Sequence, residues 1–269
     1  MDKPTLIVLH GANGSWEEMA PLIKPLVPHF DVRAINLLGH GGRPVPDGLT
    51  IDSLADDLLA WLRAERIERA FFLGYSLGGY LALHLARHHP QRALGVAAIA
   101  PKVRFDEALV AHTSYLADPV RLSRPGNPRG AELARLHGAD KWEAVTLNVR
   151  RLFQSFGNRP PLGDEDLKQL ATPVLVLNGD RDQIVSLAET RRIVELLPNA
   201  RLGLFPGPAH PLRSVPVLPA VRAIRSFIQE VIAGPFAPGP DLDLAETLVS
   251  GGLAQPELRA QIRPDRRRP

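Results

Sequence analysis

Six short apolar runs, separated by segments with helical periodicity, constrain the fold of this 269-residue chain more than any other feature. Each run has the length of one strand, and runs that are apolar at successive positions are typical of strands buried on both faces. The intervening segments carry apolar residues three and four positions apart, which is the spacing of one helix face. The apolar runs are Thr5–Leu9, Val32–Ile35, Ala70–Leu73, Leu94–Ile99, Val174–Leu177 and Arg201–Phe205.

This alternation predicts an α/β fold in which a mostly parallel sheet of about six strands is flanked by helices and joined by right-handed crossovers. A chain of 269 residues can bury a large core without disulfide or metal crosslinks, and α/β folds of this size occur as one unit. The helical segments that fit the scheme are Ile51–Ala64, Leu77–His88, Leu187–Leu197 and Val217–Ile232.

The alternation is interrupted once, by a long segment at residues 102–170. It contains no convincing strand pattern, but it carries helical patterns at Ala131–His137 and Lys141–Phe153. The segment could form two further crossover helices. Crossover connections are usually much shorter, however, so we expect a helical cap over one end of the sheet.

The resulting organisation has a core formed by residues 1–101 and 171–233, the cap at 102–170 and a C-terminal extension at 234–269. The extension is rich in Gly and Pro at its start, and a short apolar helix is expected within it at Leu242–Val249.

Composition excludes several classes of protein. The chain has no cysteine, which removes disulfides, thiolate metal sites and cysteine nucleophiles and fits a reducing cytoplasm. Its start, MDKPTLIVLHG, has one lysine before a very short apolar run and no cleavage site, so we expect a buried strand rather than a signal peptide. No apolar stretch reaches the roughly 18 residues of a membrane helix. A net charge of +3 is too small to indicate nucleic acid, so no nucleic-acid partner is expected.

The strongest chemical signal is Gly74-Tyr75-Ser76-Leu77-Gly78, which lies directly between an apolar run and a helical segment. An isolated Gly-x-Ser-x-Gly can be an ordinary flexible turn. At a sharp strand-to-helix turn, however, a strained backbone lifts the serine clear of the sheet, and its neighbours two residues away must be small. The helix that follows points its amino end at developing negative charge. We therefore predict that Ser76 is a nucleophile.

A second glycine-rich turn, His10-Gly11-Ala12-Asn13-Gly14, follows the first apolar run. Acyl transfer creates an oxyanion that needs two amide donors, and the amides of Ala12 and Leu77 are the natural pair. An ordinary glycine loop is the alternative, and His10 itself is expected to be structural because it lies on the strand side of the turn.

Two later loops supply an acid and a base. Asp180 and Asp182 follow the run Val174–Leu177, and His210 follows the last run. A carboxylate can fix the tautomer of a histidine and raise its basicity. The residues alone leave open which of the two acids has this role, because acids are also common as turn and cap residues.

A serine, an acid and a histidine in this order, each after a strand, make the chain resemble the α/β-hydrolase fold family from about Thr5 to Ile232. The resemblance implies that Ser76, Asp182 and His210 form a catalytic triad, with Asp180 as the second choice of acid. It also matches Ala12 to an oxyanion position. The Gly-His-Gly turn at 39–41 fits as well, although Asn36-Leu37-Leu38 replaces the usual Asp-x-Pro before it.

The resemblance implies an esterase-like serine hydrolase of the carboxylesterase or lactonase type. It would act on a small-molecule substrate through an acyl-enzyme, without a metal or organic cofactor. Dehalogenases and epoxide hydrolases of this fold carry an aspartate at the elbow, where this chain has Ser76. A carbon–carbon hydrolase, a menaquinone-pathway-like lyase and a non-catalytic binding module stay open. In that lyase group an arginine tends to follow the Gly-Tyr-Ser-Leu-Gly-Gly run, whereas Tyr80 stands here.

A substrate pocket is expected between the elbow and the cap. The cap is basic and contains aromatic residues, which could line an apolar pocket with a basic mouth, although aromatic residues at helical spacing can equally form the core of the cap. The candidate pocket residues are Asn13, Trp16, Tyr75, Tyr115, Trp142 and Phe153.

Overall fold

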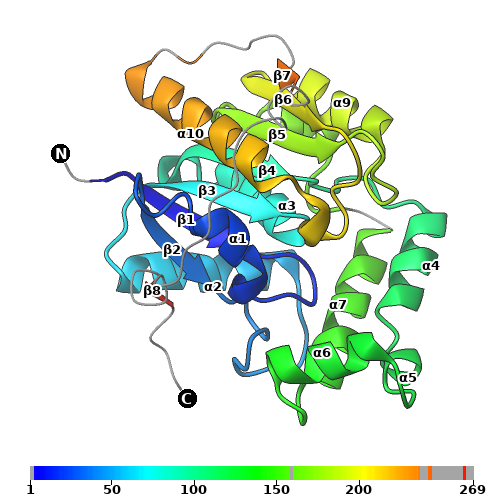
Figure 1. Ribbon diagram of the computed structural model, residues 1–269. Coiled ribbons are helices and arrows are strands. Elements are labelled where there is room, and N and C mark those ends of the chain that lie inside the picture. Colours follow the sequence, from blue (N-terminus) through cyan, green and yellow to red (C-terminus); the bar gives the residue numbers. More distant parts are fainter. Residues whose placement is uncertain (1–2, 158–159, 235, 237–241, 244–262, 265–269) are drawn as a thin grey trace.

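The computed structural model describes residues 3–157, 160–234, 236, 242–243 and 263–264. A parallel sheet lies at its centre, with six main strands in the order β6-β5-β4-β3-β1-β2 (Figure 1). The predicted α/β class and the sheet of about six parallel strands are confirmed. The main strands are β1 (Thr5–Leu9), β2 (Asp31–Ile35), β3 (Ala70–Tyr75), β4 (Ala93–Ile99), β5 (Val174–Gly179) and β6 (Ala200–Phe205).

Two-residue strands extend the sheet at both edges. β7 (Leu242–Asp243) pairs with β6, and β8 (Arg263–Pro264) pairs with β2. The helix expected at Leu242–Val249 is therefore wrong for its first two residues, and residues 244–249 lie outside the described part. The physical reason is that the edge of a sheet offers unpaired backbone groups, which compete with helix formation in any segment that can reach them.

Helices cover both faces of the sheet, as the alternation predicts. Along β1, Leu6 and Val8 pack into a core that includes residues of α1 and α10. Ile7 and Leu9 face the opposite core, which includes residues of α2 and α3. Burying each such side chain contributes about 1.5–3 kcal/mol, so strands that are apolar on both faces need both layers. These helices are α1 (Ala20–Ile23), α2 (Ile51–Ala64), α3 (Leu77–His88), α9 (Leu187–Leu196) and α10 (Val217–Ala233).

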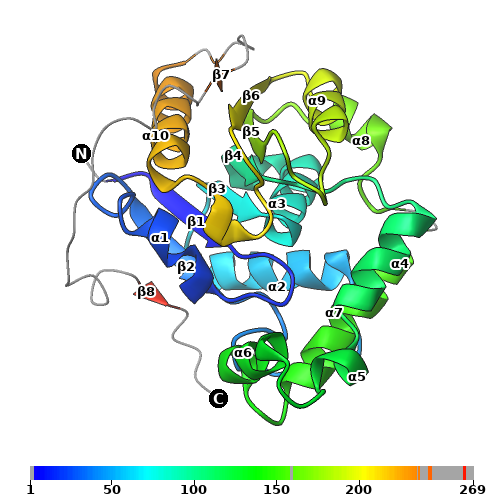
Figure 2. The same ribbon diagram turned by 45° about the vertical axis from the view of Figure 1, so that its right-hand side comes forward.

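The segment between β4 and β5 is helical, without a strand among its described residues. Figure 2 shows α4 to α7 as a group set apart from the helices that flank the sheet, whereas α8 lies beside α9. Three of these helices begin at side-chain caps, with Asp106, Asp118 and Asn127 accepting backbone N–H groups. The helices are α4 (Glu107–Leu116), α5 (Pro119–Leu122), α6 (Pro128–His137), α7 (Trp142–Phe156) and α8 (Asp164–Lys168).

The packing of α3 against β1 generates a stability prediction. A Cβ atom at Gly78 would lie 2.4 Å from the Leu9 carbonyl oxygen and 2.5 Å from that of His10, both of which are backbone atoms. Gly78→Ala should therefore push α3 away from the sheet and lower the free energy of unfolding by about 2 kcal/mol or more. Urea unfolding of Gly48→Ala is the control, since no atom lies within 4 Å of a Cβ there. Equal stability of the two variants would contradict this account of the packing.

Candidate active site

The candidate residues lie at one edge of the sheet because each follows a parallel strand. Ser76 follows β3, Asp182 follows β5 and His210 follows β6, while the Ala12 turn follows β1. The carboxyl ends of parallel strands meet at the same edge, where ligands of α/β proteins bind.

Ser76 occupies a strained turn. Its backbone has φ 50° and ψ −112°, an arrangement that costs on the order of 1–3 kcal/mol for a non-glycine residue. Its N–H donates to the Ile99 carbonyl at 2.9 Å, and its own carbonyl accepts the Tyr80 N–H at 2.9 Å. A Cβ at Gly74 would lie 2.3 Å from the Gly78 carbonyl oxygen, and one at Gly78 would lie 2.4 Å from the Leu9 carbonyl oxygen, so each position flanking the serine needs glycine.

His210 lies between Ser76 and Asp182. Its Nε2 is 3.2 Å from the Ser76 Oγ, and its Nδ1 is 2.6 Å from the Asp182 Oδ2. An ionised carboxylate only accepts hydrogen bonds, so Nδ1 carries the proton and donates to Asp182. The lone pair of Nε2 therefore faces the Ser76 hydroxyl, which is the geometry a general base requires.

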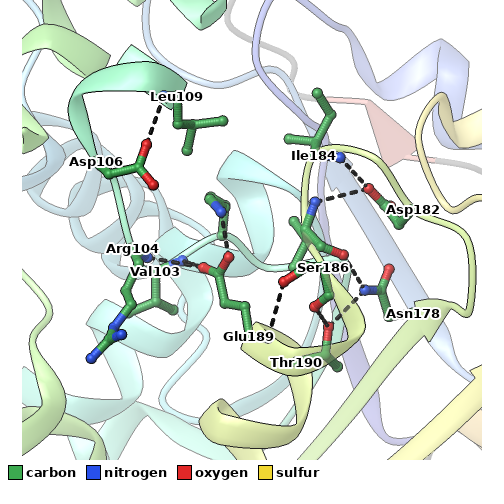
Figure 3. A network of polar contacts seen from close by, with 12 residues as sticks. Val103, Arg104, Asp106, Leu109, Asn178, Asp182, Ile184, Ser186, Glu189 and Thr190 are labelled. Atoms are coloured by element: carbon green, nitrogen blue, oxygen red, sulfur yellow. Dashed lines mark hydrogen bonds and ion pairs between the residues drawn. The ribbon is translucent and has the colours of Figure 1, made fainter.

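The carboxyl group of Asp182 is fully buried, and both of its oxygens accept hydrogen bonds. Its Oδ1 accepts the N–H groups of Ile184 and Val185 at 2.8 and 2.9 Å (Figure 3). Burial alone would raise the pKa of Asp182. The hydrogen bond and charge of His210, together with the two amides, outweigh it and lower this pKa below its ordinary value. Asp182 is therefore ionised at neutral pH.

A polar network holds the loop that carries Asp182 (Figure 3). The Asn178 Nδ2 donates to the Val185 carbonyl at 2.9 Å and to the Thr190 Oγ at 2.7 Å. Thr190 in turn donates to the Ser186 carbonyl at 3.1 Å. These bonds fix the backbone that presents the Val185 amide, so the position of Asp182 depends on buried groups of β5 and α9.

The same helix tethers the start of the segment expected to form the cap. One carboxylate oxygen of Glu189 accepts the N–H groups of Val103 and Arg104 at 3.1 and 3.0 Å, and the other pairs with Lys102 (Figure 3). The first residues after β4 are thereby attached to α9, and through Thr190 to the loop that holds Asp182.

Asp180 has a different environment from Asp182. Its Oδ1 accepts the Gly207 N–H at 2.6 Å, and a Cβ at Gly179 would lie 2.0 Å from the Gly207 carbonyl oxygen. Asp180 therefore fastens the loop that carries His210, whereas Asp182 contacts the imidazole itself. No contact between Asp180 and His210 is found in the part of the chain that the structure describes.

The turn after β1 runs beside the serine. A Cβ at Gly11 would lie 3.6 Å from the Ser76 Cβ and 2.8 Å from the ring of Tyr75. Leu77 is the first residue of α3, so its N–H has no partner within the helix. These positions bring the Ala12 turn and the Leu77 amide beside Ser76, which is the arrangement expected of two oxyanion donors.

Three buried histidines join this turn to its surroundings. The His10 Nε2 accepts the Leu37 N–H at 3.0 Å, so its Nδ1 donates to the Gly11 carbonyl at 2.7 Å. The ring of His40 lies 5.2 Å from that of His10 and 5.5 Å from that of His137, the last residue of α6. His137 is a functional candidate that no sequence pattern indicates, because its role depends on where α6 docks.

The predicted pocket residues are dispersed. Tyr75 borders His210, with ring centroids 5.3 Å apart, and Asn13 and Trp16 belong to the turn after β1 or follow it closely. Tyr115 is 60% exposed beside Arg121, which places it on the outer surface. Trp142 packs among Leu122 and Leu133, and Phe153 stacks on Phe105. Among the described residues, none of the last three contacts Ser76 or His210.

An open cavity of about 520 Å³ lies elsewhere, between the start of the 102–170 segment and α8, and the three candidate catalytic residues do not line it. Three of its lining residues are the acids Asp164, Glu165 and Asp166.

Among the residues placed by the structure, no group of three or more His, Asp and Glu side chains is arranged to hold a metal ion. Within the same ranges, no helix is long and apolar enough to cross a membrane.

Comparison with known proteins identifies the family. A family model described as alpha/beta hydrolase fold matches residues 4–139, just over half of the chain. The chain belongs to the alpha/beta hydrolase fold family. The resemblance inferred from the sequence is thus confirmed, and so is hydrolase family membership.

Relatives within this family are hydrolases by name. The chain is 28% identical to "Putative carbamate hydrolase RutD" of Caulobacter sp., over 78% of this chain and 84% of the relative. It is 29% identical to the pimeloyl-[acyl-carrier protein] methyl ester esterase of Xanthomonas axonopodis pv. citri, over 77% and 88%. The crystal structure of the enol-lactonase from Burkholderia xenovorans LB400 shares the fold, with a TM-score of 0.69, 21% identity and coverage of 86% and 93%.

The buried histidines beside the site predict how stability depends on pH. Burial lowers the pKa of His40 to about 4, and it also lowers the pKa values of His10 and His137. An unfolded chain binds these protons near pH 6.5, so stability is fully present above that pH and falls as the pH drops towards 4. Each histidine contributes a slope of up to about 1.4 kcal/mol per pH unit.

Urea unfolding between pH 7 and 4.5 tests this dependence. His40→Gln should flatten the slope, whereas His112→Gln, at an exposed position, should leave it as in the wild type. Parallel slopes for wild type and His40→Gln would show that burial of His40 is not the cause.

Proposed function

We propose that this protein is a serine hydrolase that cleaves an ester-like bond of a small molecule, as a carboxylesterase or lactonase does. The observation that carries the proposal is the hydrogen-bonded series of Asp182, His210 and Ser76, with the serine on a strained strand-to-helix turn. The hydrogen bond and charge of His210, together with the two amide bonds, keep Asp182 ionised despite its burial, and the fixed carboxylate keeps the imidazole oriented.

In the acylation step, the His210 Nε2 takes the proton of the Ser76 hydroxyl as Oγ attacks the substrate carbonyl carbon. The carbonyl oxygen becomes an oxyanion, which accepts hydrogen bonds from the amides of Ala12 and Leu77. When the tetrahedral intermediate collapses, the bond to the leaving alkoxide breaks, and that oxygen takes the proton from His210. The acyl group stays on Ser76.

Deacylation repeats the sequence with water. His210 removes a proton from a water molecule, the hydroxide attacks the acyl carbon, and the Ser76 Oγ leaves with the proton that His210 returns. The products are a carboxylic acid and the free enzyme. All proton transfers use His210, which is why its orientation by Asp182 is central.

The named relatives support a carbonyl substrate with a heteroatom leaving group. One is named as a methyl ester esterase and another as a carbamate hydrolase, and the chain covers more than four fifths of both. We further propose that residues 102–170 act as a cap that selects a small substrate, and that the enzyme works in the cytoplasm.

Two alternatives use the same site. A carbon–carbon hydrolase or a menaquinone-pathway-like lyase could use the same three residues. Tyr80, which stands where that lyase group tends to have an arginine, is buried, stacks on Phe156 and accepts the Leu162 N–H at 2.8 Å. Residue 80 therefore supplies no positive charge to the site, in contrast to the arginine of the lyase group. A non-catalytic binding module would have no need of an ionised, fully buried Asp182.

Hydrolysis of short-chain nitrophenyl esters tests the proposal. The wild type should hydrolyse them, and Ser76→Ala should reduce kcat to background because no nucleophile is left. Asp182→Asn should lower kcat about 10³–10⁴-fold, since the amide favours the wrong imidazole tautomer. Asp180→Asn is the matched control. It keeps an oxygen that can accept the Gly207 N–H, and kcat should stay within about threefold of the wild type.

The pattern of losses separates the possibilities. A loss in Asp180→Asn with an active Asp182→Asn would reassign the acid. Retained activity in Ser76→Ala would rule out the serine mechanism. An inert wild type would rule out these esters as substrates and favour carbon–carbon substrates or binding without turnover.

A further inference from the structure

A single backbone carbonyl in the turn after β1 receives two donors from helix α6. The His137 Nε2 lies 3.2 Å from the Asn13 carbonyl oxygen, and the Nδ1 of the same ring accepts the Gly41 N–H at 3.0 Å. Because Nδ1 accepts, the proton of the neutral ring is on Nε2, which donates to Asn13. His137 therefore bridges two loops of the core from outside it.

The second donor is Arg129, at the start of the same helix. Its Nη2 lies 3.3 Å from the Asn13 carbonyl oxygen, and its Nη1 pairs with Glu132 at 2.6 Å. A hydrogen bond from a guanidinium is stronger than one between neutral groups. The two ends of α6 thus converge on one acceptor, whose two lone pairs can accept both donors.

This carbonyl belongs to the turn that carries the proposed oxyanion donor. The Gly14 N–H donates to the Gly11 carbonyl at 3.1 Å and closes a turn whose central residues are Ala12 and Asn13. Asn13 has φ 55°, a left-handed conformation that asparagine adopts more readily than most non-glycine residues. Its buried side-chain Oδ1 has no hydrogen-bond partner among the described residues, whereas the donors from α6 bind its backbone carbonyl.

We propose that His137, assisted by Arg129, is a positioning residue that orients the Ala12 amide towards the oxyanion. The inference rests on the proposed function and deepens it. The Asn13 carbonyl and the Gly14 N–H share one peptide plane, so α6 fixes the direction of the Gly14 N–H by holding that carbonyl. The Gly14 N–H in turn binds the Gly11 carbonyl, which shares its peptide plane with the Ala12 N–H. The segment at 102–170 thereby supports the proposed oxyanion hole through α6.

Two isosteric variants separate the two bonds of His137. Gln places an amide N–H near the position of Nε2, so His137→Gln keeps the bond to Asn13 and loses that from Gly41. Asn places an oxygen near Nδ1, so His137→Asn keeps the bond from Gly41 and loses that to Asn13. Each variant loses one hydrogen bond, so a merely structural role predicts equal effects. Arg135→Ala is the control on the same helix, since Arg135 pairs only with Glu17 at the surface in the described part of the chain.

Steady-state ester hydrolysis should show an asymmetry. We expect His137→Asn to lower kcat about tenfold with KM within about twofold, because a misaligned amide weakens binding of the transition state rather than of the substrate. His137→Gln and Arg135→Ala should keep kcat within about threefold of the wild type. Equal kcat values for the Asn and Gln variants, or an effect confined to KM, would overturn the proposal.

Amide hydrogen exchange separates this inference from the proposed function. Exchange in residues 10–15 should be faster in His137→Asn than in the wild type and in His137→Gln, and thermal unfolding confirms that each variant is folded. If the wild type hydrolyses no ester, the proposed function fails, and exchange still decides whether His137 holds the turn. Unchanged exchange in His137→Asn would overturn the inference even in an active enzyme.

Discussion

The close approach of helix α3 to strands β1 and β3 is the constraint on which the rest of the site depends. At this point backbone packs directly on backbone, since a Cβ at Gly74 or Gly78 would lie within 2.5 Å of main-chain atoms. That approach forces Ser76 into a strained conformation and places the first amides of α3 beside it. It also presses α3 against the end of β1, which brings the Ala12 turn to the serine. One contact therefore sets the nucleophile and both proposed oxyanion donors.

Polar bonds then connect this edge of the sheet to the segment at 102–170 on two sides. On one side, Glu189 ties the residues after β4 to α9, and α9 supports the loop of Asp182 through Thr190. On the other side, His137 and Arg129 bind the Asn13 carbonyl. The helical segment is thus attached at both the acid and the proposed oxyanion turn. A change in the position of this segment would therefore displace the loop of Asp182, the Asn13 turn, or both.

Features encoded by local periodicity could be predicted from the sequence. Helices Ile51–Ala64 and Leu77–His88 and strand Thr5–Leu9 have the bounds that their apolar spacing indicates. The continuous apolar run of the strand predicts burial on both faces, and the apolar spacing of the helices predicts burial on one face. The order of Ser76, Asp182 and His210, each after a strand, was equally visible in the sequence, although their catalytic role stays a prediction.

Features that depend on tertiary contact could not be predicted in this way. The short strand at Leu242–Asp243 exists because β6 offers an open edge, which composition does not reveal. Tyr115 and Trp142 are equally aromatic in sequence, yet one lies on the surface and the other in a small core within the helical segment at 102–170. His137 became a candidate only when the docking of α6 placed it against Asn13.

The central claim is that His210 and Asp182 activate Ser76, and covalent labelling of the folded wild type with a fluorophosphonate tests it most directly. Intact mass and peptide mapping would count the adducts and locate them. We predict one adduct per chain, on Ser76, in the folded protein. We predict none after unfolding in urea, because His210 then no longer lies beside Ser76 to activate its hydroxyl. An unlabelled folded protein, or an adduct on another residue with Ser76 free, would contradict it.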